Sequence, residues 1–281
     1  MRWQTLAILL IVGARQVCAT EALGRVLPQL SDSIAGAECA RFTDYYINAS
    51  NKVFKLNPRC WARKLDVSSC SVWNSNKAGH PTGTLITPRH VIFAMHYPMR
   101  GIESLTFVSR SGEAVTRQLV RTEKLFYESH LVPDLSVGLL SHDIPTNAIM
   151  PAYVLPPDFA KSLPRAPPER LPAVWLNQHK EVSIWDVWPT DDTRQVVLLP
   201  TEHGRFKAYH RNIVYYDSGS PVYGFIDGRP VLLTVWTQGS GNNGVGTSVA
   251  AYADAVNGLI EKLSPGEGYK LQILELGGGG T

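Results

Sequence analysis

The sequence predicts an all-β protein built from two antiparallel β units and one C-terminal helix. Short segments rich in β-branched and aromatic residues recur from about residue 60 to residue 250, with turn residues between them. A proline-rich stretch divides these segments into two groups, and a clear helical pattern follows the last segment. Many short strands with few helices are typical of antiparallel barrels or sandwiches.

The N-terminus has the pattern of a signal peptide over residues 1–19. Arg2 precedes the apolar run "LAILLIV", and the small residues of "VCA" offer a cleavage site. The run is too short to span a bilayer, and no later stretch is long and apolar enough to do so. The alternative is a buried N-terminal strand or helix. We expect a secreted, extracellular or periplasmic protein with no membrane association after cleavage. Residues 20–57 lack clear periodicity and are interpreted as an N-terminal extension or pro-segment.

Charge and cysteine content exclude several kinds of partner. Removal of residues 1–19 leaves 25 basic and 24 acidic residues, so nothing favours nucleic acid or an anionic membrane. Cys39, Cys60 and Cys70 allow one disulfide, of which Cys60–Cys70 is the simplest pairing, although connectivity is not fixed by sequence. No Cys/His spacing resembles a zinc site, and we expect no metal and no organic cofactor.

The first β unit is expected over about residues 58–145. "LDVSSCSVW" alternates apolar and polar residues, and "GTLIT" and "HVIFAM" flank a Pro-Arg turn. "SLTFVSR" and "AVTRQLV" form a hairpin pattern around Ser-Gly, and "DLSVGLL" is a short buried strand.

The second β unit is expected over about residues 173–250. Before it, a connection over about 146–172 contains seven prolines from position 151 on, which exclude a central strand or a long helix. Strand patterns resume with "AVWL", "VSIWDV", "RQVVLLP", "FKAYH", "NIVYY", "PVYGF", "PVLLTVW" and "GTSVA". Residues 250–263 have helical spacing, and the tail over 264–281 is interpreted as flexible.

Three stretches together supply the groups that serine hydrolysis requires. Such chemistry needs a hydroxyl nucleophile, an imidazole to take its proton and a carboxylate to orient the imidazole. His96 follows a strand in "VIFAMHY", Asp134 begins the strand "DLSVGLL", and Ser218 lies in the turn "YYDSGSPV". The order His, Asp, Ser along the chain occurs in one known type of catalytic triad. Two other types have the orders Ser, Asp, His and Asp, His, Ser.

The same stretches resemble those of chymotrypsin/trypsin-like serine peptidases. "LITPRHVIFAMHY" is similar to the family's "LIsprhvlTAAHC", "DLSVGLL" to "DIALLrL", and "DSGSPV" to "GDSGGPl". The serine motif is most similar to bacterial glutamyl-endopeptidase and exfoliative-toxin relatives. The resemblance covers roughly residues 60–263. It implies two Greek-key β-barrels, with the site in the cleft between them.

The resemblance also assigns roles to the residues. Ser218 would be the nucleophile, His96 the general base and Asp134 the group that orients the imidazole. The backbone N–H groups of Tyr216 and Ser218 would bind the oxyanion. The substrate pocket would be lined by Asn212, Trp236, Thr237, Gly244 and Gly246, with space for a substrate side chain left by the two glycines.

Two features of the serine turn depart from the family. Tyr216 replaces a glycine, and a positive φ at this position would strain a tyrosine or lead the peptide to flip. In the animal members of the family, the aspartate at the position of Asp217 pairs with the N-terminal amine of a cleaved Ile-Val-Gly-Gly segment, and this sequence contains no such segment. Arg211 or a processed N-terminus within residues 20–60 would then be its partner.

The sequence therefore predicts a secreted serine endopeptidase that acts on a protein or peptide through an acyl-enzyme. The alternative is a weak or inactive pseudoprotease that binds peptides through the same cleft. The oligomeric state is not predicted.

Overall fold

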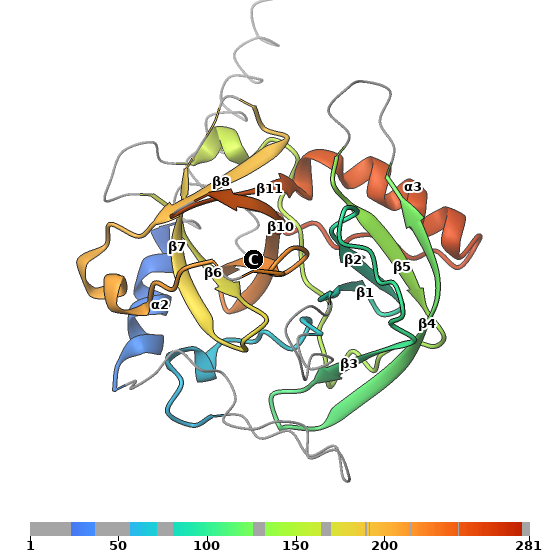
Figure 1. The fold of residues 1–281 in the computed structure, drawn as a ribbon, viewed down its shortest axis with the longest axis horizontal. Helices are drawn as coiled ribbons and strands as arrows, with labels where there is room; N and C mark the ends of the chain where they lie inside the picture. Colours follow the sequence, from blue (N-terminus) through green and yellow to red (C-terminus); the bar gives the residue numbers. More distant parts are fainter. Residues whose placement is uncertain are drawn as a thin grey trace, which may run out of the picture.

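The computed structural model describes residues 24–36, 57–71, 81–125, 133–163, 170–188, 190, 192–213, 215–240 and 242–276. The predicted signal peptide and Cys39 lie outside these ranges. Two β units stand next to each other, as Figure 1 shows, and a helix follows the last strand. The predicted all-β architecture with two units and a C-terminal helix is confirmed.

The first unit is a five-stranded antiparallel sheet in the order β1-β2-β5-β4-β3. Its strands are β1 (Thr84–Thr87), β2 (His90–Phe93), β3 (Ser104–Val108), β4 (Ala114–Lys124) and β5 (Ser136–Leu140). The sheet curls around a core of its own, and Leu85, Val91, Phe93, Leu105 and Phe107 are at most 1% exposed there.

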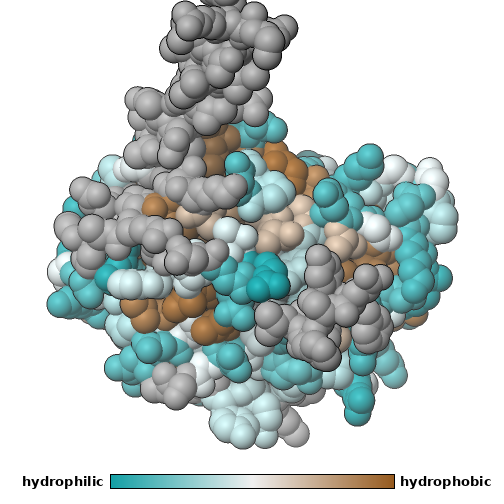
Figure 2. Space-filling model, turned by 90° about the horizontal axis from the view of Figure 1, so that it is seen from above, coloured by the Kyte–Doolittle hydropathy of each residue, from teal (hydrophilic) through white to brown (hydrophobic). Residues whose placement is uncertain are grey.

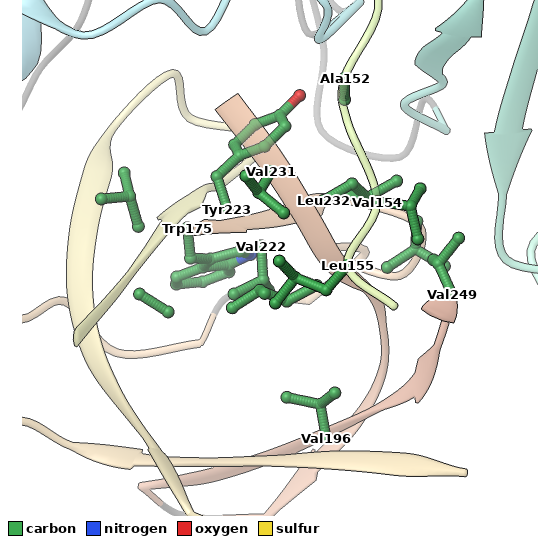
Figure 3. Close-up of a cluster of buried hydrophobic side chains, with 14 of the residues drawn as sticks. Ala152, Val154, Leu155, Trp175, Val196, Val222, Tyr223, Val231, Leu232 and Val249 are labelled. Carbon is green, nitrogen blue, oxygen red and sulfur yellow. The ribbon is translucent and has the colours of Figure 1, made fainter. Parts of the chain in front are cut away.

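The second unit is a closed barrel in the order β10-β11-β8-β7-β6-β9. Its strands are β6 (Pro172–Leu176), β7 (Val182–Trp188), β8 (Gln195–Pro200), β9 (Pro221–Ile226), β10 (Arg229–Ser240) and β11 (Asn243–Ser248). Figure 3 shows Trp175, Val222 and Val196 directed into its interior. Closure leaves no exposed sheet edge over most of this unit.

Three predicted strands are absent. Residues 206–210 lie largely in the 3-10 helix η4 (Gly204–Tyr209), where Phe206 alone is buried. The described part of 212–216 is a loop and turn, and the described part of 65–73 contributes only a single bridge, from Cys70 to Thr84. These segments have a composition typical of strands but few ladder partners, so the local sequence alone was misleading.

The connection between the units contains an extended segment, residues 151–155, which we call the seam because it pairs with both units. Tyr153 donates its backbone N–H to Pro230 and accepts one from Leu232, while the Ala152 N–H binds the Leu85 carbonyl. Figure 3 shows Val154 and Leu155 against the side chains of β9 and β10. A short 3-10 helix, η3 (Phe159–Ser162), follows. The connection therefore joins the two cores and is part of them.

The described part of the C-terminal tail, residues 264–276, pairs with the connection between the units, whereas the sequence predicted a flexible tail. The Val154 N–H donates to Gln272 and its carbonyl accepts from Leu274, which pairs the tail with the seam. Leu271 and Leu274 are each 6% exposed. The apolar side chains of "LQIL" anchor the tail, while its glycine-rich end over 277–281 lies outside the described residues.

Two helices lie on the outside of the β units. The predicted C-terminal helix is α3 (Ala253–Leu263), preceded by the 3-10 helix η5 (Ala250–Tyr252), and it packs on β4 and β5. The N-terminal extension contains a helix that the sequence did not indicate, α2 (Val26–Ile34). It packs on β9 and on the 3-10 helix η1 (Trp61–Lys64), and Val26 and Leu30 are fully buried.

The simplest disulfide pairing is wrong. Cys60 and Cys70 are not joined to each other, and both are fully buried in the larger core.

The surface shown in Figure 2 mixes hydrophilic and hydrophobic residues, and the hydrophobic ones form separate patches among those drawn in colour. No helix in the described ranges is long and apolar enough to cross a membrane.

Candidate active site

His96, Asp134 and Ser218 converge from three separate elements. β2 and β5 pair antiparallel, with Phe93 opposite Ser136, so the segments just beyond this pair lie side by side. His96 follows β2 and Asp134 precedes β5 in these segments. Ser218 comes from the other unit, in the turn before β9. The sheet register therefore brings the imidazole and the carboxylate together, and the packing of the two units adds the hydroxyl.

The imidazole of His96 bridges the other two side chains. Its Nδ1 lies 2.5 Å from Asp134 Oδ2, and its Nε2 lies 2.8 Å from Ser218 Oγ. The other carboxylate oxygen of Asp134 accepts the backbone N–H of His96 at 2.8 Å, and the Asp134 N–H binds Thr247 Oγ1 at 3.2 Å. Because the carboxylate accepts from Nδ1–H, the lone pair of Nε2 faces the hydroxyl.

The solvent exposure of His96 and Asp134 suits a reaction with an external molecule. The His96 side chain is 45% exposed, while that of Asp134 is 13% exposed. The carboxylate is thus largely held away from bulk water beside the ring that it orients, while nearly half of the His96 side chain remains open to solvent.

The backbone around Ser218 is left-handed on both sides. Tyr216 has φ of 74° and Gly219 has φ of 86°. A Cβ at Gly219 would lie 3.3 Å from both the Ala94 nitrogen and the Thr82 carbonyl oxygen, so a side chain there would be crowded as well as strained by the positive φ. Tyr216 adopts the glycine-type conformation at a steric cost of about 1–2 kcal/mol.

Gln178 holds this turn by two hydrogen bonds. It lies just after β6 and donates its backbone N–H to Asp217 Oδ1 at 3.0 Å. Its side-chain amide donates to the carbonyl oxygen of Tyr216. The Tyr216 ring stacks on Tyr97 with centroids 6.1 Å apart, and burial raises the pKa of the Tyr97 hydroxyl, which stays protonated at neutral pH. Sequence reasoning missed Gln178, because a single amide after a strand carries no recognisable motif.

Arg211 does not serve as the partner of Asp217. Its guanidinium donates to the carbonyl oxygens of Ala208 and His210. Asp217 is 1% exposed and accepts from the Gln178 backbone. A backbone N–H that donates to a buried carboxylate stabilises its charge.

The glycines predicted to open a substrate pocket leave space for the protein's own side chains instead. A Cβ on Gly244 would lie 1.8 Å from Cη2 of Trp236, and a Cβ on Gly246 would lie 2.1 Å from Oγ1 of Thr234. Asn212 is exposed, and Thr237 contributes its carbonyl oxygen 3.5 Å from Ser218 Oγ. Side chains of the protein therefore occupy the space at these two glycines, and the role of the five residues in a substrate pocket stays a prediction.

A hollow of about 500 Å³ lies beside His96. It is lined by Pro81, Met95, His96, Tyr97, Pro98, Arg100 and Lys124. Both charged residues in this lining are basic. Among the described residues, no group of three or more His, Cys, Asp or Glu could hold a metal ion.

Comparison with known proteins adds a structural likeness only. No family model matches the sequence, and no curated protein matches it. A solved structure of a mutant of human heparin binding protein is similar at 16% identity, with a TM-score of 0.49. The match covers 72% of this chain and 92% of the other.

Proposed function

We propose that the protein is a serine endopeptidase of the chymotrypsin-like type, acting on protein or peptide substrates. The observation that carries the proposal is the bridging position of His96, whose ring nitrogens meet Asp134 and Ser218 at hydrogen-bond distance. Three side chains from distant parts of the chain meet with the relative orientation that nucleophilic catalysis requires. The pattern of residues 1–19 supports export of the protein.

The reaction would proceed through an acyl-enzyme. Ser218 Oγ attacks the substrate carbonyl carbon while His96 Nε2 takes the hydroxyl proton, and Asp134 stabilises the imidazolium that forms. His96 then protonates the leaving amine as the peptide C–N bond breaks. Water, deprotonated by the same nitrogen, attacks the ester, and Ser218 regains its proton when the acid leaves.

The negative oxygen of the tetrahedral intermediate needs donors prepared in advance. We assign this role to the backbone N–H groups of Ser218 and Tyr216. The left-handed φ of Tyr216 supports the assignment, because a tyrosine is held in this conformation only where surrounding contacts impose it. Loss of one such donor typically lowers kcat by about 10²–10³.

A fluorophosphonate probe tests the proposal directly. The exported full-length protein is expected to be labelled at Ser218, with the modified peptide identified by mass spectrometry. Ser218→Ala should abolish labelling, and His96→Gln should slow it strongly. Ser111→Ala, in the turn between β3 and β4, is the matched control and should be labelled as fast as wild type.

The alternative is a peptide-binding protein without turnover. The observation that favours it is the tyrosine in place of a glycine at position 216. Failure of the wild type to react with the probe, together with retained peptide binding, would replace the proposed enzyme by this binding module.

A further inference from the structure

The edge of β10 beside Ser218 is where an extended peptide can bind. Ser218 Oγ lies 3.5 Å from the Thr237 carbonyl oxygen. β9 begins at Pro221, opposite Val235, so beyond the Trp236 contact with the serine turn β10 pairs only with β11 among the described residues. Extended peptides add to such an open edge through main-chain hydrogen bonds. The substrate residue whose carbonyl is attacked would then lie against the stretch from Thr237 to Gly239.

The space next to this stretch is occupied by Trp236 and Ile213. Gly239 and Gly244 are cross-strand partners, and both have atoms of Trp236 where a Cβ would stand. A Cβ on Gly239 would lie 2.9 Å from Cζ2 of Trp236 and 2.4 Å from Cδ1 of Ile213. On Gly244 it would lie 1.8 Å from Cη2 of the same indole. The two glycines thus accommodate the indole and do not leave a void for a substrate side chain.

The indole is fixed in this place by its neighbours in the barrel. Its ring stacks on Trp175 with centroids 5.0 Å apart and meets Trp185 edge-on at 5.5 Å. Trp236 is 2% exposed, and Figure 3 shows Trp175 inside the barrel. A ring held between two aromatic neighbours in a close-packed interior does not swing away for a substrate. The filled space is therefore a permanent feature of the site.

We propose that Trp236, with Ile213, determines specificity by restricting the substrate residue before the cleaved bond to a small one, such as glycine, alanine or serine. This inference rests on the proposed function, because it concerns the substrate class of the same site. Large, aromatic or long charged side chains at that position would meet the indole.

The first test is a substrate series on the exported full-length protein. Peptide p-nitroanilides that differ only in the last residue, alanine or phenylalanine, are compared by kcat/KM. The wild type is expected to prefer alanine by about 100-fold or more, since each unaccommodated methylene costs about 10–200-fold. Ile213→Ala and Trp236→Leu are expected to raise the phenylalanine/alanine ratio by about tenfold or more. Trp188→Leu, on an exposed part of β7, is the control and should leave the ratio unchanged.

Ile213→Ala keeps the test valid if Trp236→Leu does not fold, because Ile213 lies in a loop and is only half-buried where it packs against the core. Equal use of both substrates by the wild type would overturn the proposal. So would an unchanged ratio in a folded Ile213→Ala protein.

A binding experiment separates this inference from the proposed function. Peptides ending in alanine or phenylalanine carboxylate are titrated into the Ser218→Ala protein by calorimetry. In one outcome the wild type hydrolyses neither substrate while the Ser218→Ala protein binds the alanine peptide at least about tenfold more tightly than the phenylalanine peptide. That result would exclude the enzyme and leave the size restriction standing. Equal binding of both peptides, or binding of neither, overturns the restriction.

Discussion

The side-chain amide of Gln178 donates a hydrogen bond to the carbonyl oxygen of Tyr216. The same residue donates its backbone N–H to the buried carboxylate of Asp217. Gln178 therefore fixes two consecutive residues of the serine turn, Tyr216 and Asp217. Since the peptide groups of this turn are the proposed oxyanion donors, Gln178 acts on catalysis through their orientation.

Gln178→Glu is expected to lower kcat by about 10-fold to 100-fold with little change in KM, less than the loss of a whole oxyanion donor. Glutamate has nearly the same size as glutamine but cannot donate to the Tyr216 carbonyl, and its charge repels that oxygen. Steady-state kinetics with an ester substrate give both constants. The control is His179→Ala, an exposed neighbour that should behave as wild type. A kcat within twofold of wild type for Gln178→Glu would contradict the positioning role.

Tyr216 occupies its strained conformation because contacts hold it there, so removal of the strain should change little. Tyr216→Gly is expected to react with the fluorophosphonate probe within about fivefold of the wild-type rate, equivalent to roughly 1 kcal/mol. Tyr216→Val should react at least about tenfold more slowly, because β-branched residues rarely adopt positive φ. A large gain in rate for Tyr216→Gly would instead show that the tyrosine turn is misaligned in the wild type.

The proposed catalytic groups were predictable because each lies in a local pattern at a strand end. His96 and Asp134 then come together by the register of β2 and β5, which hydrophobic strands specify strongly. Gln178 was not predictable, since it reaches Tyr216 across 38 residues of sequence through tertiary packing alone. No local pattern indicated either that the Trp236 indole occupies the space beside Gly239 and Gly244. A shift of register between Trp236 and Gln238 decides which side chains face the barrel interior, and no local pattern reports it.

The same distinction between local pattern and tertiary packing applies to the chain termini. α2 is short, and among the described residues it packs mainly on η1 and β9, which cover its two fully buried residues, Val26 and Leu30. The tail over 264–276 is fixed by backbone pairing to the seam of the proline-rich connection, where prolines had argued against regular structure. In both places distant contacts override a weak local signal.

Asp134 sets the tautomer of His96, which gives a separate kinetic prediction. Asp134→Asn is expected to keep the fold and to lower kcat by about 10⁴, the size of the effect that this change has in a well-studied Ser-His-Asp triad. An amide facing Nδ1 favours the tautomer that carries its proton on Nε2, and this nitrogen then cannot accept from Ser218. Asp143→Asn, on the exposed loop after β5, is the control. Retention of more than about a tenth of the wild-type kcat by Asp134→Asn would contradict the tautomer role.

His90 makes the stability of the protein depend on pH. The side chain is fully buried between Thr87 Oγ1, 2.8 Å from Nδ1, and Ser264 Oγ, 3.0 Å from Nε2. Burial and then the nearby charge of Arg89 lower its pKa from 6.5 to about 4, although Asp143 opposes this. Between these two pH values the unfolded chain binds more protons at this residue than the folded chain does. The contribution to stability is therefore complete above about pH 6.5 and is lost as the pH falls towards 4.

The full loss at His90 is on the order of 3 kcal/mol, since one pKa unit corresponds to about 1.4 kcal/mol, and the part expected between pH 7 and pH 4.5 is about 2 kcal/mol. Urea unfolding at pH 7 and pH 4.5 measures it as a difference in the free energy of unfolding. His90→Gln removes the titrating group, so the difference between the two pH values should shrink by most of this amount, whatever its effect at pH 7. His142→Gln, which changes an exposed histidine, should retain the wild-type difference. If His90→Gln and wild type lose stability equally between the two pH values, the buried imidazole is not the group responsible.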